Sequence, residues 1–177
     1  MIRYDHQIEI QLGILQHCEP GWVFEFGVYK GQSLRLFRHA DPTRHMVGFD
    51  SFEGLPQAWR PGYPQGHFRS TEPIAIEGVD IVKGLFEHTV APYFQDLSVP
   101  VGLVHIDCDL YSSTATVLEG IAPVLLPGVV ILFDEYRNYP GYEQHEYRAW
   151  QECREQLNLN THEIACSGHQ QSAWQIV

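Results

Sequence analysis

The sequence contains neither the long apolar run of a membrane span nor the pattern of an export signal. No stretch of about 18 consecutive apolar residues occurs, so we expect no segment that crosses a membrane. The first 20 residues carry charges throughout, whereas a signal peptide has a basic start and an apolar middle. We therefore expect a cytoplasmic protein with no membrane partner.

Paired cysteines and positive charge are also scarce. The four cysteines stand singly at positions 18, 108, 153 and 166, without a CxxC pair, which predicts reduced thiols rather than a disulfide framework. The ten histidines form no close-set group with them, so a structural zinc site is not expected. Only 11 Lys and Arg residues stand against 22 Asp and Glu, and the formal charge of −11 disfavours nucleic acid as a partner but suits a divalent cation.

What the sequence does contain is the alternation of an α/β domain. With 44% hydrophobic and 19% charged residues, its 177 residues fit one globular domain, 1–177. Continuous apolar runs alternate with segments of helical periodicity, which predicts a mostly parallel sheet covered by helices on both faces. The predicted strands cover 22–26, 45–49, 79–84, 101–106 and 128–133, and residues 162–177 read as two further strands joined at "SGHQQS".

One segment breaks this alternation. Residues 53–78 are rich in Pro and Gly and carry Trp59, Tyr63 and Phe68. A structureless loop of this length in a compact domain is usually either a functional lid or a disordered insertion. We expect a lid over the active site, because ligands of parallel α/β sheets bind beyond the carboxyl ends of the strands.

The first polar motif at such an end is "FEFGVYKGQS", residues 24–33. Gly27 and Gly31 allow the backbone to turn tightly and approach a ligand, and the start of the next helix supplies free N–H groups. The spacing is GxxxG instead of GxGxxG, so the fingerprint of a dinucleotide pyrophosphate is absent. Glu25 would repel a pyrophosphate but attract an ammonium or sulfonium group, which predicts a cationic ligand.

The second motif, "GFDSFEG", follows the next predicted strand. Asp50 stands where an acidic residue can accept hydrogen bonds from both hydroxyls of a ribose, and Phe52 is near enough to touch an adenine. A ribose together with a positive charge suggests S-adenosylmethionine. The alternative is structural, with Glu25 capping a helix and Asp50 beginning a turn.

Four carboxylates follow two later strands. Asp107 and Asp109 lie one residue apart on the same face of an extended chain, and Asp134 and Glu135 end the next apolar run. One helix separates the two strands, so we expect them to be neighbours. Like charges crowded in a partly dry cleft take up protons or bind a cation, and carboxylate oxygens suit Mg²⁺, Ca²⁺ or Mn²⁺.

We interpret this acidic edge as the chemical centre. Asp107, Asp134 and Glu135 are predicted to hold the divalent cation, and Asp109 is predicted to act as the general base for O-methyl transfer. The alternative is that a strand-end Asp caps the following helix, which accounts for one carboxylate but not for four. His145 stands just beyond this edge and is a candidate contact to the acceptor or the metal.

With these residues in view, the chain resembles the macrocin O-methyltransferase (TylF-like) family of class I methyltransferases. The resemblance lies in "FEFGVYKGQSL", "GFDSFEGLP", "VKGLFEHTVAPYF", "HIDCDLYSST" and "FDEYRNYPGYEQHEYRAW". It implies a three-layer Rossmann-like fold whose seven-stranded, mostly parallel sheet has an antiparallel C-terminal hairpin. It also implies Mg²⁺ at Asp107, Asp134 and Glu135, Asp109 as base, and S-adenosylmethionine at Glu25, Gly27, Val28, Tyr29, Gly31, Ser33, Asp50, Ser51, Phe52, Lys83, Gly84 and Asp107.

The sequence departs from the family in two places. Glu135 stands where the family usually has a second Asp, and only one helix fits before the first of these strands. Acceptor recognition then falls to the 53–78 loop, the 136–146 segment or a second subunit of a homo-oligomer. We expect a Mg²⁺-assisted O-methyltransferase for a sugar or phenol of a natural product, and keep as alternatives a metal-independent methyltransferase and a catalytically idle cofactor-binding module.

Overall fold

A single mixed sheet carries the whole fold. The computed structural model describes residues 1–71 and 74–177, and its strands lie in the order β1–β7–β8–β6–β5–β2–β3–β4. The prediction of a mostly parallel sheet with an antiparallel C-terminal hairpin is confirmed, because only β8 runs against its neighbours, β6 and β7. The strands are β1 (Ile2–Tyr4), β2 (Trp22–Phe26), β3 (Met46–Asp50), β4 (Val79–Lys83), β5 (Val101–Ile106), β6 (Val130–Phe133), β7 (Thr161–Ser167) and β8 (Ser172–Ile176).

The prediction of seven strands is wrong by one. The extra strand, β1, pairs parallel to β7, with Ile2 opposite Ala165. It is three residues long and its side chains are largely exposed, so it has neither the length nor the apolar pattern that announces a strand in a sequence. The strand follows from pairing with a partner that is distant in the chain.

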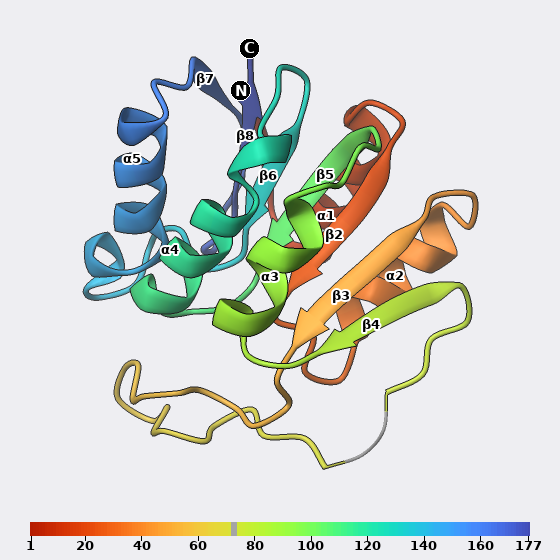
Figure 1. Ribbon diagram of the computed structural model, residues 1–177. Helices are drawn as coiled ribbons and strands as arrows, with labels where there is room; N and C mark the ends of the chain where they lie inside the picture. The colour runs from red at the N-terminus through yellow and green to blue at the C-terminus, as the bar shows by residue number, and fades with distance from the viewer. Residues whose placement is uncertain (72–73) are drawn as a thin grey trace.

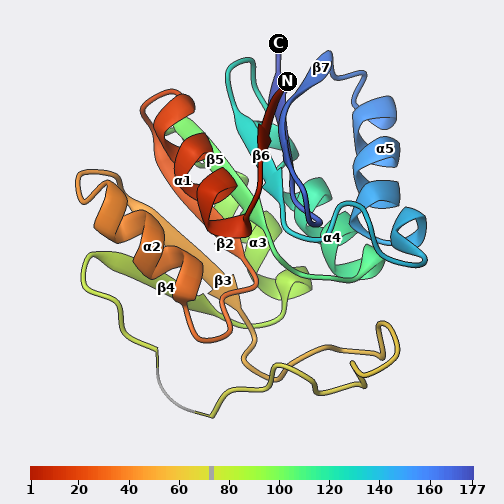
Figure 2. The same cartoon turned by 180° about the vertical axis from the view of Figure 1, so that it is seen from behind.

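Helices cover both faces of the sheet (Figures 1 and 2). Helices α1 (Gln7–His17) and α2 (Gln32–Ala40) lie on one face, and α3 (Phe86–Phe94), α4 (Tyr111–Gly120) and α5 (Glu146–Gln156) lie on the other. Two short 3₁₀ turns, η1 (Ala122–Val124) and η2 (Tyr142–Gln144), complete the elements. None of the helices within the described residues has the length and apolar character needed to span a bilayer.

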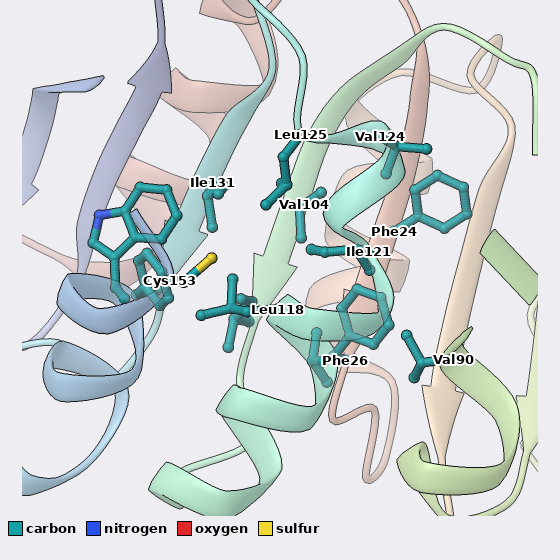
Figure 3. Packing of buried hydrophobic residues seen from close by; sticks show 14 of the residues in the cluster. Phe24, Phe26, Val90, Val104, Leu118, Ile121, Val124, Leu125, Ile131 and Cys153 are labelled. Carbon is teal, nitrogen blue, oxygen red and sulfur yellow. The ribbon is translucent and has the colours of Figure 1, made fainter. Parts of the chain in front are cut away.

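Alternation along the strands divides the apolar side chains between two cores. On the α3–α5 side, Phe24 and Phe26 of β2 pack with Leu118 and Ile121 from α4 and its C-terminal end (Figure 3). On the opposite side, Val23 of β2 belongs to the core beneath α1 and α2. Full burial of side chains of this size contributes about 1.5–3 kcal/mol each. The central strands are therefore fixed on both faces, which makes their carboxyl ends a rigid base for a site.

The carboxyl ends of the parallel strands share one edge of the sheet, and the 53–78 loop passes beneath it (Figures 1 and 2). In the β5–β6 pair, Ile106 lies opposite Phe133, so Asp107 and Asp134 leave the sheet side by side. This is the neighbouring arrangement that the sequence predicted for the two acidic strand ends. The described residues of the loop, 53–71 and 74–78, contain no helix or strand, as expected, and residues 72–73 lie outside the described part of the chain.

Candidate active site

Three buried or half-buried polar side chains meet at the acidic edge. The Nδ1 atom of His105 lies 2.9 Å from Oε2 of Glu25, and its Nε2 atom lies 3.6 Å from Oδ1 of Asp134. One ligand atom from each of His105, Asp107 and Asp134 lies within 4.8 Å of the others. His105 therefore links the interior carboxylate of β2 to the acidic edge, and no pattern in the sequence indicates this role.

Asp109 and Glu135 belong to the same group of charges. Burial, followed by the charge of Asp134, raises the pKa of Asp109 from an ordinary 3.8 to about 7. Burial and the same neighbour also raise the pKa of Glu135 well above its usual range. Asp109 has a backbone φ of 62°, in the left-handed region that Asp tolerates better than most residues. The four carboxylates predicted from the sequence are therefore close enough for their negative charges to repel one another.

Glu146, a fifth carboxylate, has no signal in the sequence that singles it out. It is fully buried at the start of α5, and its two oxygens accept backbone N–H groups from Cys108 at 3.4 Å and Glu135 at 3.0 Å. One side chain thereby ties the turn after β5 to the turn after β6. Burial and the charge of Asp109 raise the pKa of Glu146 to about 8. No local pattern marks this residue, because both of its partners are contributed by other strands.

The donor set fits a hard divalent cation. Within the described residues, His105 Nε2 and Glu135 Oε2 are buried and lack a hydrogen-bond partner. Such orphaned atoms are costly in an interior unless something satisfies them, and a cation would do so while relieving the repulsion among the carboxylates. Carboxylate oxygens with a single imidazole match Mg²⁺ or Mn²⁺ better than the closely set N and S ligands of structural zinc.

The glycine turn after β2 is locked by its neighbours. Gly27 has a φ of +92°, and a Cβ atom there would collide with the carbonyl oxygen of Asp107. Asp50 fixes the same turn, since its Oδ2 accepts N–H groups from Val28 at 2.8 Å and Tyr29 at 2.7 Å. Its Oδ1 accepts a third, from Phe52, at 2.7 Å. A carboxylate offers about four acceptor positions, so Asp50 has one left for a ligand hydroxyl instead of the two expected.

A cavity of about 470 Å³ lies between this turn, the ends of β3, β4 and β5, and the loop. That volume is within the range of small-molecule sites. Leu55, Pro56 and Phe68 of the 53–78 loop form part of its wall, together with Asp109. The loop therefore forms part of the cavity wall, and its action as a lid stays a prediction. Of the residues predicted to contact the cofactor, Gly27, Tyr29, Asp50, Ser51, Gly84 and Asp107 line this cavity.

The remaining predicted cofactor residues lie elsewhere. Val28 and Ser33 line a second cavity of about 370 Å³, which shares Tyr29 and Asp107 with the first. Glu25 is fully buried against His105 rather than facing either cavity, so it acts on a ligand only through that histidine or through its charge. The other residues that line neither cavity are Gly31, Phe52 and Lys83, whose contacts to a cofactor stay predictions.

Comparison with known proteins places this site in context. Residues 24–136 match the sequence profile of a family described as a methyltransferase domain. The chain is also similar to the 8-demethyl-8-(2,3-dimethoxy-alpha-L-rhamnosyl)-tetracenomycin-C 4'-O-methyltransferase of Streptomyces olivaceus, with 30% identity over 71% of this chain and 60% of that protein. It thus spans about 60% of the length of this curated relative.

Solved structures show the same fold. The crystal structure of a calicheamicin methyltransferase is 24% identical, with a TM-score of 0.74 over 95% of this chain and 76% of that one. An apo structure of the same protein, described as a TDP-rhamnose 3'-O-methyltransferase of calicheamicin biosynthesis, is 25% identical, with a TM-score of 0.66 and coverage of 95% and 76%. Each match covers 95% of this chain, so these structures share its overall fold.

Proposed function

The chain belongs to the methyltransferase-domain family, and on this basis we propose that it is an S-adenosylmethionine-dependent O-methyltransferase that uses a divalent cation and a small hydroxylated acceptor. The observation that carries the proposal is the double role of Asp107. This side chain lines the large cavity and also belongs to the cluster with His105 and Asp134. A methyl donor in the cavity and a cation at the cluster would therefore be neighbours.

The cavity suits the donor on grounds of charge and hydrogen bonding. S-adenosylmethionine supplies an electrophilic methyl group on a positively charged sulfur. Asp107 and Asp109 on the cavity wall favour such a charge over an anionic dinucleotide. The free acceptor position on Asp50 suits one ribose hydroxyl, and Gly84 with Leu85 and Phe86 at the start of α3 offers an adenine a largely apolar wall.

The acidic edge provides the rest of the chemistry. Asp107, Asp134 and His105, whose ligand atoms lie close together, are the groups we propose to hold Mg²⁺. Glu135, which was predicted as a ligand, lies outside this cluster but offers a buried Oε2 without a partner. The charge of the ion would make a nearby acceptor hydroxyl more acidic. Asp109 accepts the hydroxyl proton while the acceptor oxygen bonds to the methyl carbon and the carbon–sulfur bond breaks. The products are the methyl ether, S-adenosylhomocysteine and a protonated Asp109, so atoms and charge balance.

We propose a sugar of a natural product as the acceptor, with a phenol as the second choice. The support is that both relatives described above are named for methylation of a rhamnose-type sugar. Because this chain spans only part of the curated relative, the acceptor must be found by experiment. A panel of rhamnosides and hydroxylated aromatics, assayed with labelled donor and Mg²⁺, would identify the class.

One set of measurements tests the function. We expect calorimetry to show binding of S-adenosylhomocysteine and expect EDTA to stop methyl transfer. We expect Asp109→Asn to reduce turnover by about 10²–10⁴-fold while leaving that binding intact. Asn accepts the left-handed backbone of Asp109, so the turn is preserved. Asp80→Asn, at a solvent-exposed carboxylate, is the matched control. Activity that survives EDTA would favour a metal-independent methyltransferase, and binding without turnover of any acceptor would favour an idle module.

A further inference from the structure

The 53–78 loop meets the segment after β6 in a cluster of aromatic and cationic side chains. The ring of Trp59 lies 5.7 Å from that of Tyr139 and 6.2 Å from that of His145, measured between centroids. Tyr63 packs edge-on against Trp59 at 5.0 Å. With Arg60 at its centre, we refer to this group of five residues as the Arg60 cluster. It joins two segments that the sequence marked separately as candidates for acceptor recognition.

Aromatic rings surround the guanidinium group of Arg60. Its central carbon lies 3.8 Å from the ring centroid of Trp59, 4.7 Å from that of Tyr139 and 4.8 Å from that of Tyr63. Among the described residues, no carboxylate lies within ion-pair distance of Arg60. Stacked faces fix the plane of a guanidinium and leave its N–H edge available, which is the geometry that binds a carboxylate or phosphate through two parallel hydrogen bonds.

The cluster also holds several polar atoms without partners. In the described part of the chain, Arg60 Nε and His145 Nδ1 are buried and make no hydrogen bond. Trp59 Nε1 and Tyr139 Oη are also buried and have no partner other than each other. Unsatisfied polar atoms are costly in an interior, and packing alone does not account for this group of them. A ligand rich in acceptor oxygens would satisfy them together.

The position of the cluster relates it to the candidate base. Arg60 is close enough to Asp109 that its charge partly offsets the burial and Asp134 charge that raise the pKa of that carboxyl. Burial lowers the pKa of His145, and Arg60 lowers it further, so the imidazole stays neutral near pH 7. A ring-shaped acceptor bound here would extend from Arg60 toward Asp109, which removes the hydroxyl proton in the function proposed above.

We propose that the Arg60 cluster is the acceptor subsite and that it takes an oxyanion, a phosphate or a carboxylate, carried on the hydroxylated ring that is methylated. This inference rests on the proposed function and adds the charge of the acceptor. A neutral polyol could accept hydrogen bonds from the guanidinium through its hydroxyl oxygens, but it would leave the positive charge of Arg60 without a compensating negative charge. The chain has a net charge of −11, which repels anions in general. An arginine enclosed by three rings would therefore attract an anionic group to this one place.

Three probes of similar shape separate the alternatives: glucose 1-phosphate, glucuronate and the neutral methyl glucoside. Their dissociation constants are measured by tryptophan fluorescence and calorimetry with Mg²⁺ and S-adenosylhomocysteine present, at matched ionic strength. We expect at least one charged probe to bind roughly 10- to 100-fold more tightly than the neutral probe. Tighter binding of glucose 1-phosphate identifies the oxyanion as a phosphate, and tighter binding of glucuronate identifies it as a carboxylate.

Substitutions of Arg60 test whether this residue causes the preference for charged probes. Arg60→Ala should abolish the preference for charge, and Arg60→Lys should keep only part of it, because an ammonium lacks the planar fork. Tyr139→Phe removes one donor without changing the ring and should weaken charged and neutral probes alike. Arg154→Ala is the matched control. The guanidinium carbon of Arg154 lies 5.1 Å from the ring centroid of Trp174, so this arginine also packs on an aromatic ring but does not belong to the Arg60 cluster.

Two outcomes overturn the inference: equal affinity of wild-type protein for neutral and charged probes, including no binding of any probe, or a charge preference that persists in Arg60→Ala. Each variant is checked for an unchanged melting temperature and unchanged binding of S-adenosylhomocysteine, so loss of fold is not mistaken for loss of the subsite. Failure of the wild-type protein to bind S-adenosylhomocysteine is a separate result and counts against the proposed function instead.

Discussion

The side-chain nitrogen of Gln7 lies 2.9 Å from both carboxylate oxygens of Asp134. A nitrogen at equal distance from the two oxygens fills the position between them, where a cation bound through both oxygens would sit. A cation at the acidic edge would therefore have to approach Asp134 from the outer side of one oxygen. Gln7 is the first residue of α1, so this contact also ties the N-terminal helix to the acidic edge.

Removal of this hydrogen-bond donor should weaken metal binding. In Gln7→Leu the carboxylate of Asp134 loses its only side-chain hydrogen bonds within the described residues and is free to rotate. Loss of such outer partners typically costs about 10–100-fold in metal affinity. Calorimetry with Mn²⁺ measures the change, and Gln16→Leu on the exposed side of the same helix is the control. Equal affinities for the two variants would contradict this role of Gln7.

The metal-free protein should lose stability as the pH rises from about 4 to 8. Burial and the charge of Asp134 raise the pKa of Asp109 to about 7, and burial and the charge of Asp109 raise that of Glu146 to about 8. Over this interval the folded state binds more protons than the unfolded state, so the free energy of unfolding falls with pH. The loss is on the order of several kcal/mol, since each unit of pKa shift corresponds to about 1.4 kcal/mol.

Urea unfolding in EDTA at pH 5 and pH 8 measures this loss. Addition of Mg²⁺ at pH 8 should restore most of the difference, because the cation replaces the protons as the source of neutralising charge. A free energy of unfolding that is flat with pH in EDTA would show that the carboxylates do not interact as strongly as their positions indicate.

Replacement of Gly27 should damage both fold and cofactor binding. A Cβ atom there would collide with the backbone carbonyl oxygen of Asp107. Backbone atoms cannot move aside as the end of a flexible side chain can. Gly128 is the matched control, since its φ of +97° is equally unsuited to alanine but open space surrounds it. Gly128→Ala should cost about 1–2 kcal/mol from the backbone conformation alone. Gly27→Ala should lower the melting temperature further and abolish calorimetric binding of S-adenosylhomocysteine.

The buried pair of Glu25 and His105 should behave as a stabilising unit. Glu25→Ala leaves the imidazole without its partner at 2.9 Å in a fully buried position. Breaking a buried ion pair in this way typically costs about 3–5 kcal/mol in the free energy of unfolding, as measured by urea denaturation. Arg148→Ala, which removes an exposed pair with Glu152, should leave that free energy almost unchanged. Similar effects for the two variants would refute the structural role of Glu25.

The sequence predicted the parts of the site that depend on local pattern. Apolar strands have a short period and end abruptly at polar residues, so this pattern alone places Asp107 and Asp134 at neighbouring carboxyl ends, where they lie. The same reasoning located the turn at Gly27, since a glycine that follows a strand and precedes a helix indicates an unusual backbone.

The sequence did not predict the contacts made across the fold. Gln7 reaches Asp134 across 127 positions of the chain, and Glu146 contacts two turns that arise from separate strands. Glu25 was interpreted as a ligand contact because the sequence shows its charge. Its pairing with His105 could not be predicted from the sequence. Long-range pairing of polar side chains depends on the register of strands and the angle of helices, which periodicity leaves open.

Glu146 couples the position of α5 to the two turns that carry the acidic residues. The helix begins with a carboxylate that accepts hydrogen bonds from both acidic turns, so a shift of the whole helix along its axis would displace the backbone at Cys108 and Glu135 together. A movement of this helix would therefore reach both acidic turns at once through a residue that lines neither cavity.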